Sequence, residues 1–171
     1  MKGYVQVYTG DGKGKTTAAM GLALRAAGAG LRVLIIQFMK ARPSAEIRAL
    51  EILSDDITIR RYGAGRFVRN KPSPKDIQAA REGLEDARRA MLSGRFDVVI
   101  LDEVNVAMAM KVVAIQDVLD LLNARPAKVE LVLTGRRAPK EIIDRSDLVT
   151  EMREVKHYFR RGVVARKGIE K

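Results

Sequence analysis

A glycine-rich stretch, TGDGKGKTT at residues 9–17, separates an apolar run typical of a β-strand from a helical pattern. Residues 4–8 (YVQVY) precede it, and residues 18–24 (AAMGLAL) follow it. Glycine adopts backbone angles that other residues rarely take, so successive N–H groups can point into one concavity. Such a nest at the start of a helix binds anions through unpaired donors and the helix dipole. The stretch therefore predicts a phosphate-binding loop between a strand and a helix.

The end of this loop carries the functional groups. Lys15 adds a full positive charge, and Thr16 supplies a hydroxyl where a phosphate-bound Mg²⁺ would lie. The spacing departs from the standard G-x-x-x-x-G-K-[ST], because Thr9 stands at the first position and Gly10 comes one residue late. We expect a tighter or differently shaped loop, with a plain turn that binds nothing as the alternative. The predicted nucleotide-binding residues of the loop are Thr9, Gly10, Asp11, Gly12, Lys13, Gly14, Lys15, Thr16 and Thr17.

Composition limits the classes of function. A chain of 171 residues can bury a sizeable core, and we expect one domain over residues 1–171. The chain has no Cys, which excludes disulfides, thiolate metal sites and a Cys nucleophile. No apolar run approaches the ~20 residues of a membrane span and no signal peptide precedes the first strand, so we expect a cytoplasmic protein without membrane association.

The chain is strongly basic, with a net charge of +11. This charge favours anionic partners such as nucleotides, nucleic acid or acidic surfaces, although solubility alone would also account for it. Four Phe, four Tyr and no Trp argue against a stacking platform for single strands. A nucleic-acid partner is therefore not expected.

Apolar runs alternate with helical patterns along the whole chain. The helix predicted from residue 72 has Ser73 as its cap, Pro74 at its first position and Asp76 to complete a capping box. The β-α-β-α order predicts an α/β fold of the P-loop NTPase (RecA-like) kind, a mostly parallel sheet with helices on both faces. Strands are predicted at residues 4–8, 31–38, 57–59, 96–101, 129–133 and 147–152, and helices at 18–24, 44–53, 72–92, 115–122 and 139–144.

Two acids, Asp102 and Glu103, follow the buried strand predicted at residues 96–101. In a parallel sheet the carboxyl ends of the strands lie along one edge, so these acids should lie beside the phosphate loop. Mg²⁺ takes oxygen ligands there, directly or through water, which is the Walker B arrangement. Asp102 or Glu103 is predicted to hold the water shell of the metal, and activation of a water molecule is the other candidate role for Glu103.

Three further residues are candidates for nucleotide contacts. Thr134 and Arg136 follow the strand predicted at residues 129–133, on the same edge of the sheet, and could contact a triphosphate. A turn with a solvated Arg is the alternative. Arg25 lies ten residues after Lys15 and could reach back to phosphate or ribose, or could simply lie on the surface.

Phe67 lies in a basic loop after the third predicted strand. An exposed Phe there would suit a second, flat and apolar substrate, whereas a Phe packed in the core would have no such role. His157 is the single His of the chain, and no metal is assigned to it.

With these segments, the sequence resembles the ATP:corrinoid adenosyltransferase family. The likeness covers almost the whole chain and runs through TGDGKGKTTAAMGLALRAAGAG, VLIIQFMK, LDEVNVAM, LLNARP, LVLTGRRAP, SDLVTEMREVKH and GVVARKGIE. The shortened phosphate loop is a trait of that family and favours it over ordinary P-loop kinases. The resemblance implies that cobalt(I) of a reduced corrinoid attacks the ribose 5′ carbon of ATP, and that triphosphate leaves.

The resemblance also implies roles for particular residues. Residues 10–16 would bind the triphosphate, Lys15 would neutralise it, and Thr16 would ligate Mg²⁺ (or Mn²⁺). Glu103 would hold the shell of the metal, and Arg25 would contact phosphate. Family members often read Gly-x-Gly-Phe-x-Trp after the third strand, where aromatic residues displace the lower axial ligand of cob(II)alamin. This chain reads GAGRFV at residues 63–68, so Phe67 is the candidate, one position late and without the Trp.

The partners implied by the resemblance are cob(I)alamin, cobinamide or cobyrinic acid diamide, a reductant protein such as a flavoprotein, and a second copy of the chain in a homodimer. Some members carry an N-terminal extension that covers the corrinoid of the partner subunit. This chain starts at its first strand, so that cover is expected to be missing or to come from elsewhere. Two alternatives remain: a P-loop small-molecule kinase and a RecA-like nucleic-acid-binding ATPase.

Overall fold

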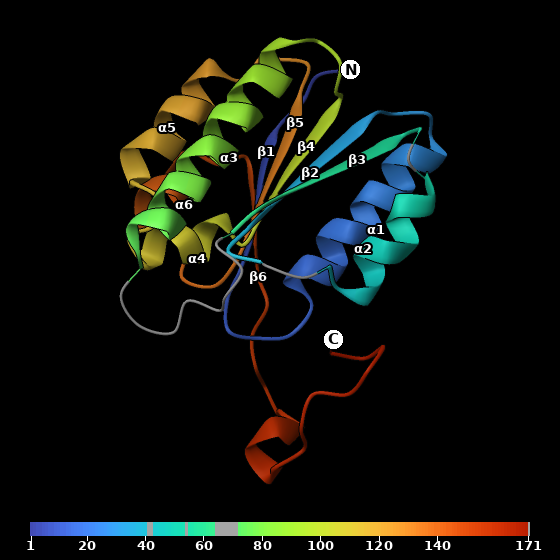
Figure 1. Cartoon of the computed structure of the whole chain (residues 1–171), viewed down its shortest axis with the longest axis vertical. Coiled ribbons are helices and arrows are strands. Elements are labelled where there is room, and N and C mark those ends of the chain that lie inside the picture. The colour runs from blue at the N-terminus through green and yellow to red at the C-terminus, as the bar shows by residue number, and fades with distance from the viewer. Residues whose placement is uncertain (41–42, 54, 64–71, 171) are drawn as a thin grey trace.

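A parallel β-sheet with helices on both faces forms the body of the molecule (Figure 1). The computed structural model describes residues 1–40, 43–53, 55–63 and 72–170. Within these residues the six strands lie in the order β3-β2-β4-β5-β1-β6, and every neighbouring pair is parallel. The α/β fold predicted from the sequence is therefore confirmed. The strands are β1 (Val5–Thr9), β2 (Val33–Phe38), β3 (Ile57–Tyr62), β4 (Val98–Asp102), β5 (Glu130–Thr134) and β6 (Leu148–Glu151).

The central strands are apolar on both faces because helices cover both sides of the sheet. Successive residues of β2 point to opposite faces: Val33 and Ile35 pack in one core cluster, and Leu34 and Ile36 in the other. Helices α1 (Lys15–Gly28) and α2 (Ala45–Leu50) cover one face. The other face is covered by α3 (Pro74–Leu92), α4 (Val104–Ala109), α5 (Ile115–Ala124) and α6 (Lys140–Asp144) (Figure 1).

The predicted capping box of α3 is confirmed. The Asp76 N–H donates to Ser73 Oγ at 3.3 Å, and the Ser73 N–H donates to Asp76 Oδ2 at 2.8 Å. Pro74 is the first residue of the helix, where its missing N–H costs nothing and its fixed φ suits the first turn. The helix begins at Pro74, as the predicted cap indicates, although the predicted range started at residue 72.

Two elements differ from the prediction. Strand β3 continues through Arg60 and Arg61 to Tyr62, which pairs with Phe38 of β2, whereas residues 57–59 alone were predicted. An edge strand accepts polar residues because solvent reaches it, so the end of β3 has no apolar signal. Helix α4 (Val104–Ala109) was not predicted, because six residues are too few to show a clear helical period. A 3₁₀-helix, η1 (Glu51–Leu53), also follows α2.

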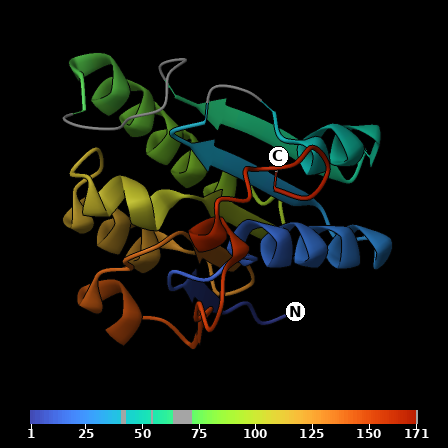
Figure 2. The same ribbon diagram turned by 90° about the horizontal axis from the view of Figure 1, so that it is seen from below.

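The chain leaves the sheet after β6 and forms a C-terminal arm, residues 152–170, that extends beyond the carboxyl edge of the sheet (Figure 1). Figure 2 shows the molecule from below, with the arm in front of the ends of several strands. It contains the 3₁₀-helix η2 (Tyr158–Arg161), and its internal ion pairs include Arg166 with Glu170 at 2.9 Å. The arm leaves large apolar side chains in solvent, and Phe159 is 70% exposed.

Among the described helices, none has the length and apolar character that crossing a bilayer requires.

Candidate nucleotide-binding site

The loop between β1 and α1 is shaped by the chain segment that follows β6. Gly10 has φ of 92°, and a Cβ there would lie 2.5 Å from the Met152 carbonyl oxygen. A Cβ at Gly12 would lie 2.6 Å from the same oxygen, to which the Gly12 N–H donates at 2.6 Å. The Met152 N–H in turn donates to the Thr9 carbonyl at 2.9 Å. Only glycine fits at both positions, so the loop and the start of the C-terminal arm form one packed unit.

Lys15 lies buried inside the curve of this loop. Its Nζ donates to the carbonyl oxygens of Gly10 at 2.7 Å and Gly12 at 2.6 Å. Burial, and then the nearby Arg136 guanidinium, lower the pKa of Lys15 from its ordinary value. The loop therefore holds a cation at a fixed place at the start of a helix, which suits the binding of a phosphate chain.

Asp102, at the end of β4, is wholly buried and joins four elements of the site. Its Oδ1 accepts from Thr16 Oγ1 and from Thr134 Oγ1, both at 2.8 Å. Its Oδ2 accepts from Gln37 Nε2 at 2.9 Å and from Lys40 Nζ at 2.7 Å. The start of α1 and the end of β5 therefore meet at the Asp102 carboxylate, at the carboxyl edge of the sheet where the sequence predicted the two acids.

The two acids of the site have opposite pKa directions. Burial alone would raise the pKa of Asp102, but the Lys40 ammonium and the hydrogen bonds from Gln37 and Thr134 outweigh it and hold that pKa below its usual range. Burial, followed by the neighbouring Asp102 carboxylate, raises the pKa of Glu103. The ionised form of Asp102 is therefore favoured, while that of Glu103 is disfavoured until further positive charge arrives.

Glu103 sits at a strained turn between β4 and α4. Its φ of 65° is in the left-handed region, which is uncommon for a non-glycine residue and is often found at functional sites. Its N–H donates to Thr134 Oγ1 at 3.0 Å. Thr134 thus bridges the backbone of Glu103 and the carboxylate of Asp102, which fixes both acids relative to β5.

The comparisons with known proteins agree on one family. The family model described as ATP:corrinoid adenosyltransferase BtuR/CobO/CobP matches residues 1–170. The chain belongs to this family.

Curated relatives of this adenosyltransferase family align over nearly the whole chain. The corrinoid adenosyltransferase of Escherichia coli strain K12 is 37% identical over 170 residues, which is 99% of this chain and 86% of that protein. The corrinoid adenosyltransferase CobA of Salmonella typhimurium strain LT2 is 36% identical, with the same coverage of 99% and 86%. The corrinoid adenosyltransferase of Pseudomonas aeruginosa PAO1 is 34% identical, with 99% and 84% covered.

Other residues predicted to contact the nucleotide lie in or beside the loop of this adenosyltransferase-family chain. Thr9 is buried, and its Oγ1 accepts from the Ala138 N–H at 3.1 Å, so its side chain ties β1 to the chain after β5. Arg136 lies beside the loop, with its Nη1 4.0 Å from Asp11 Oδ1. The predicted loop residues with exposed side chains are Asp11, Lys13 and Thr17.

The predicted roles of Arg25 and Phe67 stay predictions from the sequence. Arg25 is exposed in the last turn of α1, ten residues beyond Lys15. Ten residues of helix place the two backbones about 15 Å apart along the axis. Phe67 lies outside the residues that the structure describes.

Sequence reasoning missed two donors to Asp102, Gln37 and Lys40. Gln37 carried a signal, since it is the one polar residue in the buried strand β2, and a buried amide needs a hydrogen-bond partner. Lys40 carried none, because a single Lys after a strand is ordinary. Met152 was likewise missed, since its contacts with the loop are made by the backbone.

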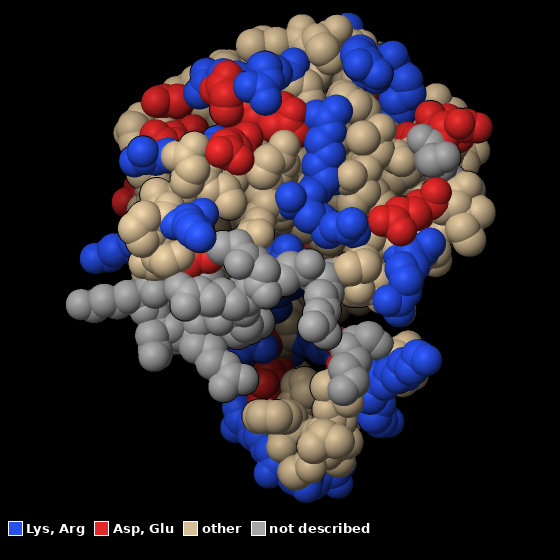
Figure 3. All heavy atoms as spheres, in the orientation of Figure 1, with Lys and Arg blue, Asp and Glu red and all other residues tan. Residues whose placement is uncertain are grey.

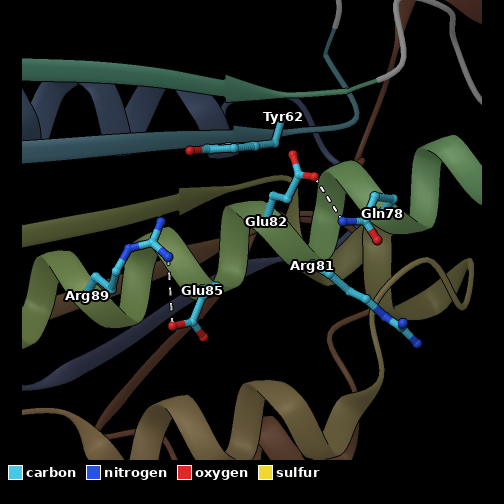
Figure 4. Close-up of a pocket in the computed structure, with 6 residues that line it drawn as sticks. All are labelled: Tyr62, Gln78, Arg81, Glu82, Glu85 and Arg89. Atoms are coloured by element: carbon cyan, nitrogen blue, oxygen red, sulfur yellow. Dashed lines mark hydrogen bonds and ion pairs between the residues drawn. The ribbon is translucent and has the colours of Figure 1, made fainter.

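A hollow of about 440 Å³ lies between the end of β3 and α3, apart from the phosphate loop (Figure 4). In that view Glu82 points toward Tyr62, and Arg81 points away toward the other side of the helix. Its charged groups contact one another along α3, as Arg89 does with Glu85 at 3.9 Å. This open hollow shares no residue with the nucleotide site, and we assign no substrate to it.

Proposed function

We propose that this chain transfers the 5′-deoxyadenosyl group of ATP to the cobalt(I) of a reduced corrinoid and releases triphosphate. The observation that carries the proposal is the glycine loop around the buried Lys15, beside the Asp102 carboxylate, in a chain that belongs to the ATP:corrinoid adenosyltransferase family. The curated relatives that support it are named corrinoid adenosyltransferases. A single domain in the cytoplasm, with the substrates held at the carboxyl edge of the sheet, is part of the proposal.

The reaction suits a site whose charged groups surround phosphate. The electron pair of cobalt(I) forms the bond to the ribose 5′ carbon, and the bond from that carbon to oxygen breaks with its electrons going to the triphosphate. Negative charge grows on the leaving group, so a fixed Lys15 and the loop N–H groups stabilise the transition state more than the ground state. Cobalt is the nucleophile of the corrinoid substrate, so the protein needs no Ser or Cys for the attack.

The residues beside the loop fit a divalent cation bound together with ATP. The Thr16 hydroxyl and the Asp102 carboxylate are 2.8 Å apart, and both are oxygen ligands of the kind that Mg²⁺ or Mn²⁺ takes beside phosphates. The buried Gln37 Oε1 has no hydrogen-bond partner among the described residues, which leaves an acceptor for metal-bound water. Mg²⁺ would neutralise the triphosphate, with Thr16, Asp102 and Glu103 as the residues that hold it or its water shell.

The corrinoid would lie beyond the phosphate loop, on the side where the C-terminal arm extends. Lys and Arg side chains gather on this arm and in a stripe over the body in front of β3 (Figure 3). The arm also exposes apolar side chains, among them Val164 and Ile169, that would lie against a corrin ring. Cob(I)alamin, cobinamide and cobyrinic acid diamide are the candidate corrinoids, with a flavoprotein as a candidate reductant. The role of Phe67 in displacing the lower cobalt ligand stays a prediction from the sequence.

We expect the protein to adenosylate chemically reduced cobalamin when ATP and Mg²⁺ are supplied. The absorption spectrum of cobalt(I) should give way to that of an alkylated corrinoid, and the product should revert under light because the carbon–cobalt bond is photolabile. A spectrum that stays that of cobalt(I), in protein whose ATP binding is verified by calorimetry, would contradict the proposal.

The proposal includes a homodimer, supported by apolar side chains that the single chain leaves in water. Phe159 is 70% exposed and Val155 is 94% exposed, both on the arm, and β6 is an outer strand of the sheet that the described residues form. Burial of such side chains is the main favourable term in association. We expect a mass of about twice the 18.9 kDa of one chain in light scattering after size exclusion.

A matched pair of variants tests the surface of that dimer. Phe159→Ser should move the mass toward that of one chain, because it removes a large apolar side chain from the arm. Ile52→Ser changes a side chain that is 83% exposed on η1, away from the arm, and should leave the mass unchanged. A wild-type mass equal to one chain would refute the homodimer.

A further inference from the structure

We infer that Lys40 is a built-in counterion of Asp102 that must leave before a metal ion can bind, so that the site takes up its metal together with ATP rather than alone. The inference rests on the proposed function for its choice of metal and nucleotide. It concerns a residue to which neither the sequence motifs nor the family match gives a role.

The backbone directs Lys40 toward Asp102. Strand β2 ends at Phe38, and the next residue, Met39, has φ of 59° in the left-handed region. This strained turn is held by the Met39 N–H, which donates to the Tyr62 carbonyl at 3.0 Å. A Cβ at Gly63 would lie 3.0 Å from the Lys40 carbonyl oxygen, so the neighbouring strand end packs closely on the same turn. A strained conformation that its neighbours hold so firmly is typical of a functional residue.

The carboxylate of Asp102 has no acceptor position left. Each of its oxygens accepts two hydrogen bonds, Oδ1 from two Thr hydroxyls and Oδ2 from Gln37 and Lys40. A carboxylate has about four lone-pair positions, so a metal ion or its water can reach Asp102 only by replacing one of these donors.

Lys40 is the donor that a cation would replace. Among the donors from the described residues it alone carries a full charge, and a divalent ion close to it would be strongly repelled. Exchange of one cation for another keeps the buried charge of Asp102 compensated, which loss of a hydroxyl or amide donor would not. The Lys40 side chain is 26% exposed, so its ammonium can return to water when it leaves.

This arrangement links the metal to the nucleotide. Without ATP, the ion must displace Lys40 with little to gain beyond what Lys40 already supplies. With ATP, the phosphates add ligands for the ion and negative charge that attracts the released ammonium. The Lys40 charge also opposes the rise in the pKa of Glu103. Lys40 therefore disfavours the metal in the absence of nucleotide and imposes little penalty in its presence.

The test uses Mn²⁺ alone, in the full chain without ATP or corrinoid, with bound ion counted by electron paramagnetic resonance. Lys40→Met should bind Mn²⁺ about tenfold to a hundredfold more tightly than the wild type, because a like charge beside the ion is gone. Lys128→Met is the matched control: it removes an exposed lysine beside Asp97, at the opposite end of β4 from Asp102, and its affinity should stay within about twofold of the wild type. Equal affinities of the wild type and Lys40→Met would overturn the inference.

Thermal unfolding is the second measurement, because a lysine with only a structural role would lower the melting temperature without any recovery when metal is added. Lys40→Met should melt at a lower temperature than the wild type in the absence of metal, and Mn²⁺ should restore most of that loss. Lys40→Gln, which can still donate to Asp102 but has no charge, keeps the test open if the Met variant does not fold, and it should also bind Mn²⁺ more tightly. A melting temperature that Mn²⁺ raises equally in wild type and variants would contradict the inference. Because no substrate is used, failure of adenosyl transfer would leave these results unaffected.

Discussion

Replacement of Lys15 by alanine is expected to abolish adenosyl transfer and to weaken ATP binding by about 10²- to 10³-fold. The ammonium of Lys15 is fixed by the carbonyl oxygens of Gly10 and Gly12, so it neutralises phosphate without reorganisation of the loop. Its loss also removes the donor shared by those two carbonyls, which loosens the turn that presents the N–H groups. Calorimetric titration with ATP and the spectroscopic assay with reduced cobalamin measure the two effects.

Lys13→Ala separates loss of charge from loss of the anchored cation. Lys13 lies in the same loop but is exposed, so its removal should lower the ATP affinity only modestly, by an amount that salt reduces. Unchanged turnover in Lys15→Ala would remove the glycine loop from the mechanism.

Asp102→Asn is expected to lower the free energy of unfolding by about 3 kcal/mol and the melting temperature by roughly 6 to 12 °C. The amide nitrogen of Asn would face donors such as the Thr16 hydroxyl, and Lys40 would lose its partner. Adenosyl transfer should fall as well, because the carboxylate is needed to hold the cation at the triphosphate. Circular dichroism melts at neutral pH measure the first effect.

Two comparisons make this result specific. Asp97→Asn changes an acid at the other end of β4 whose partner is the exposed Arg32, so it should cost no more than about 1 kcal/mol. Combining Asp102→Asn with Lys40→Met should cost clearly less than the sum of the two single changes, since each already breaks the same pair. Strict additivity would mean that Lys40 and Asp102 do not interact in solution.

The sequence predicted the fold because its strong signals are local. The run 33–38 is apolar except for Gln37, as a strand covered on both faces should nearly be, and it is wholly buried in β2. The Ser73–Asp76 capping box likewise marks the start of α3 by residues three apart. The phosphate loop needed only its glycines and Lys15. Signals of this kind do not depend on distant parts of the chain.

The parts that escaped prediction depend on contacts between distant residues. Lys40 meets Asp102 across 62 positions, and nothing beside Lys40 in the sequence marks it as different from a surface lysine. Met152 acts through its backbone, which carries no side-chain signature. The two roles left open for Arg25, a phosphate or ribose contact or a plain surface position, also depend on distant parts of the molecule, and its phosphate contact stays a prediction.

The most direct test of the central claim is the fate of the phosphates of ATP during turnover with reduced cobalamin, followed by phosphorus NMR. Attack on the ribose 5′ carbon predicts one intact triphosphate for each corrinoid alkylated, with no ADP. ADP, with a phosphorylated acceptor or free phosphate in equal amount, would mean that phosphorus is attacked instead of carbon, and would contradict the account.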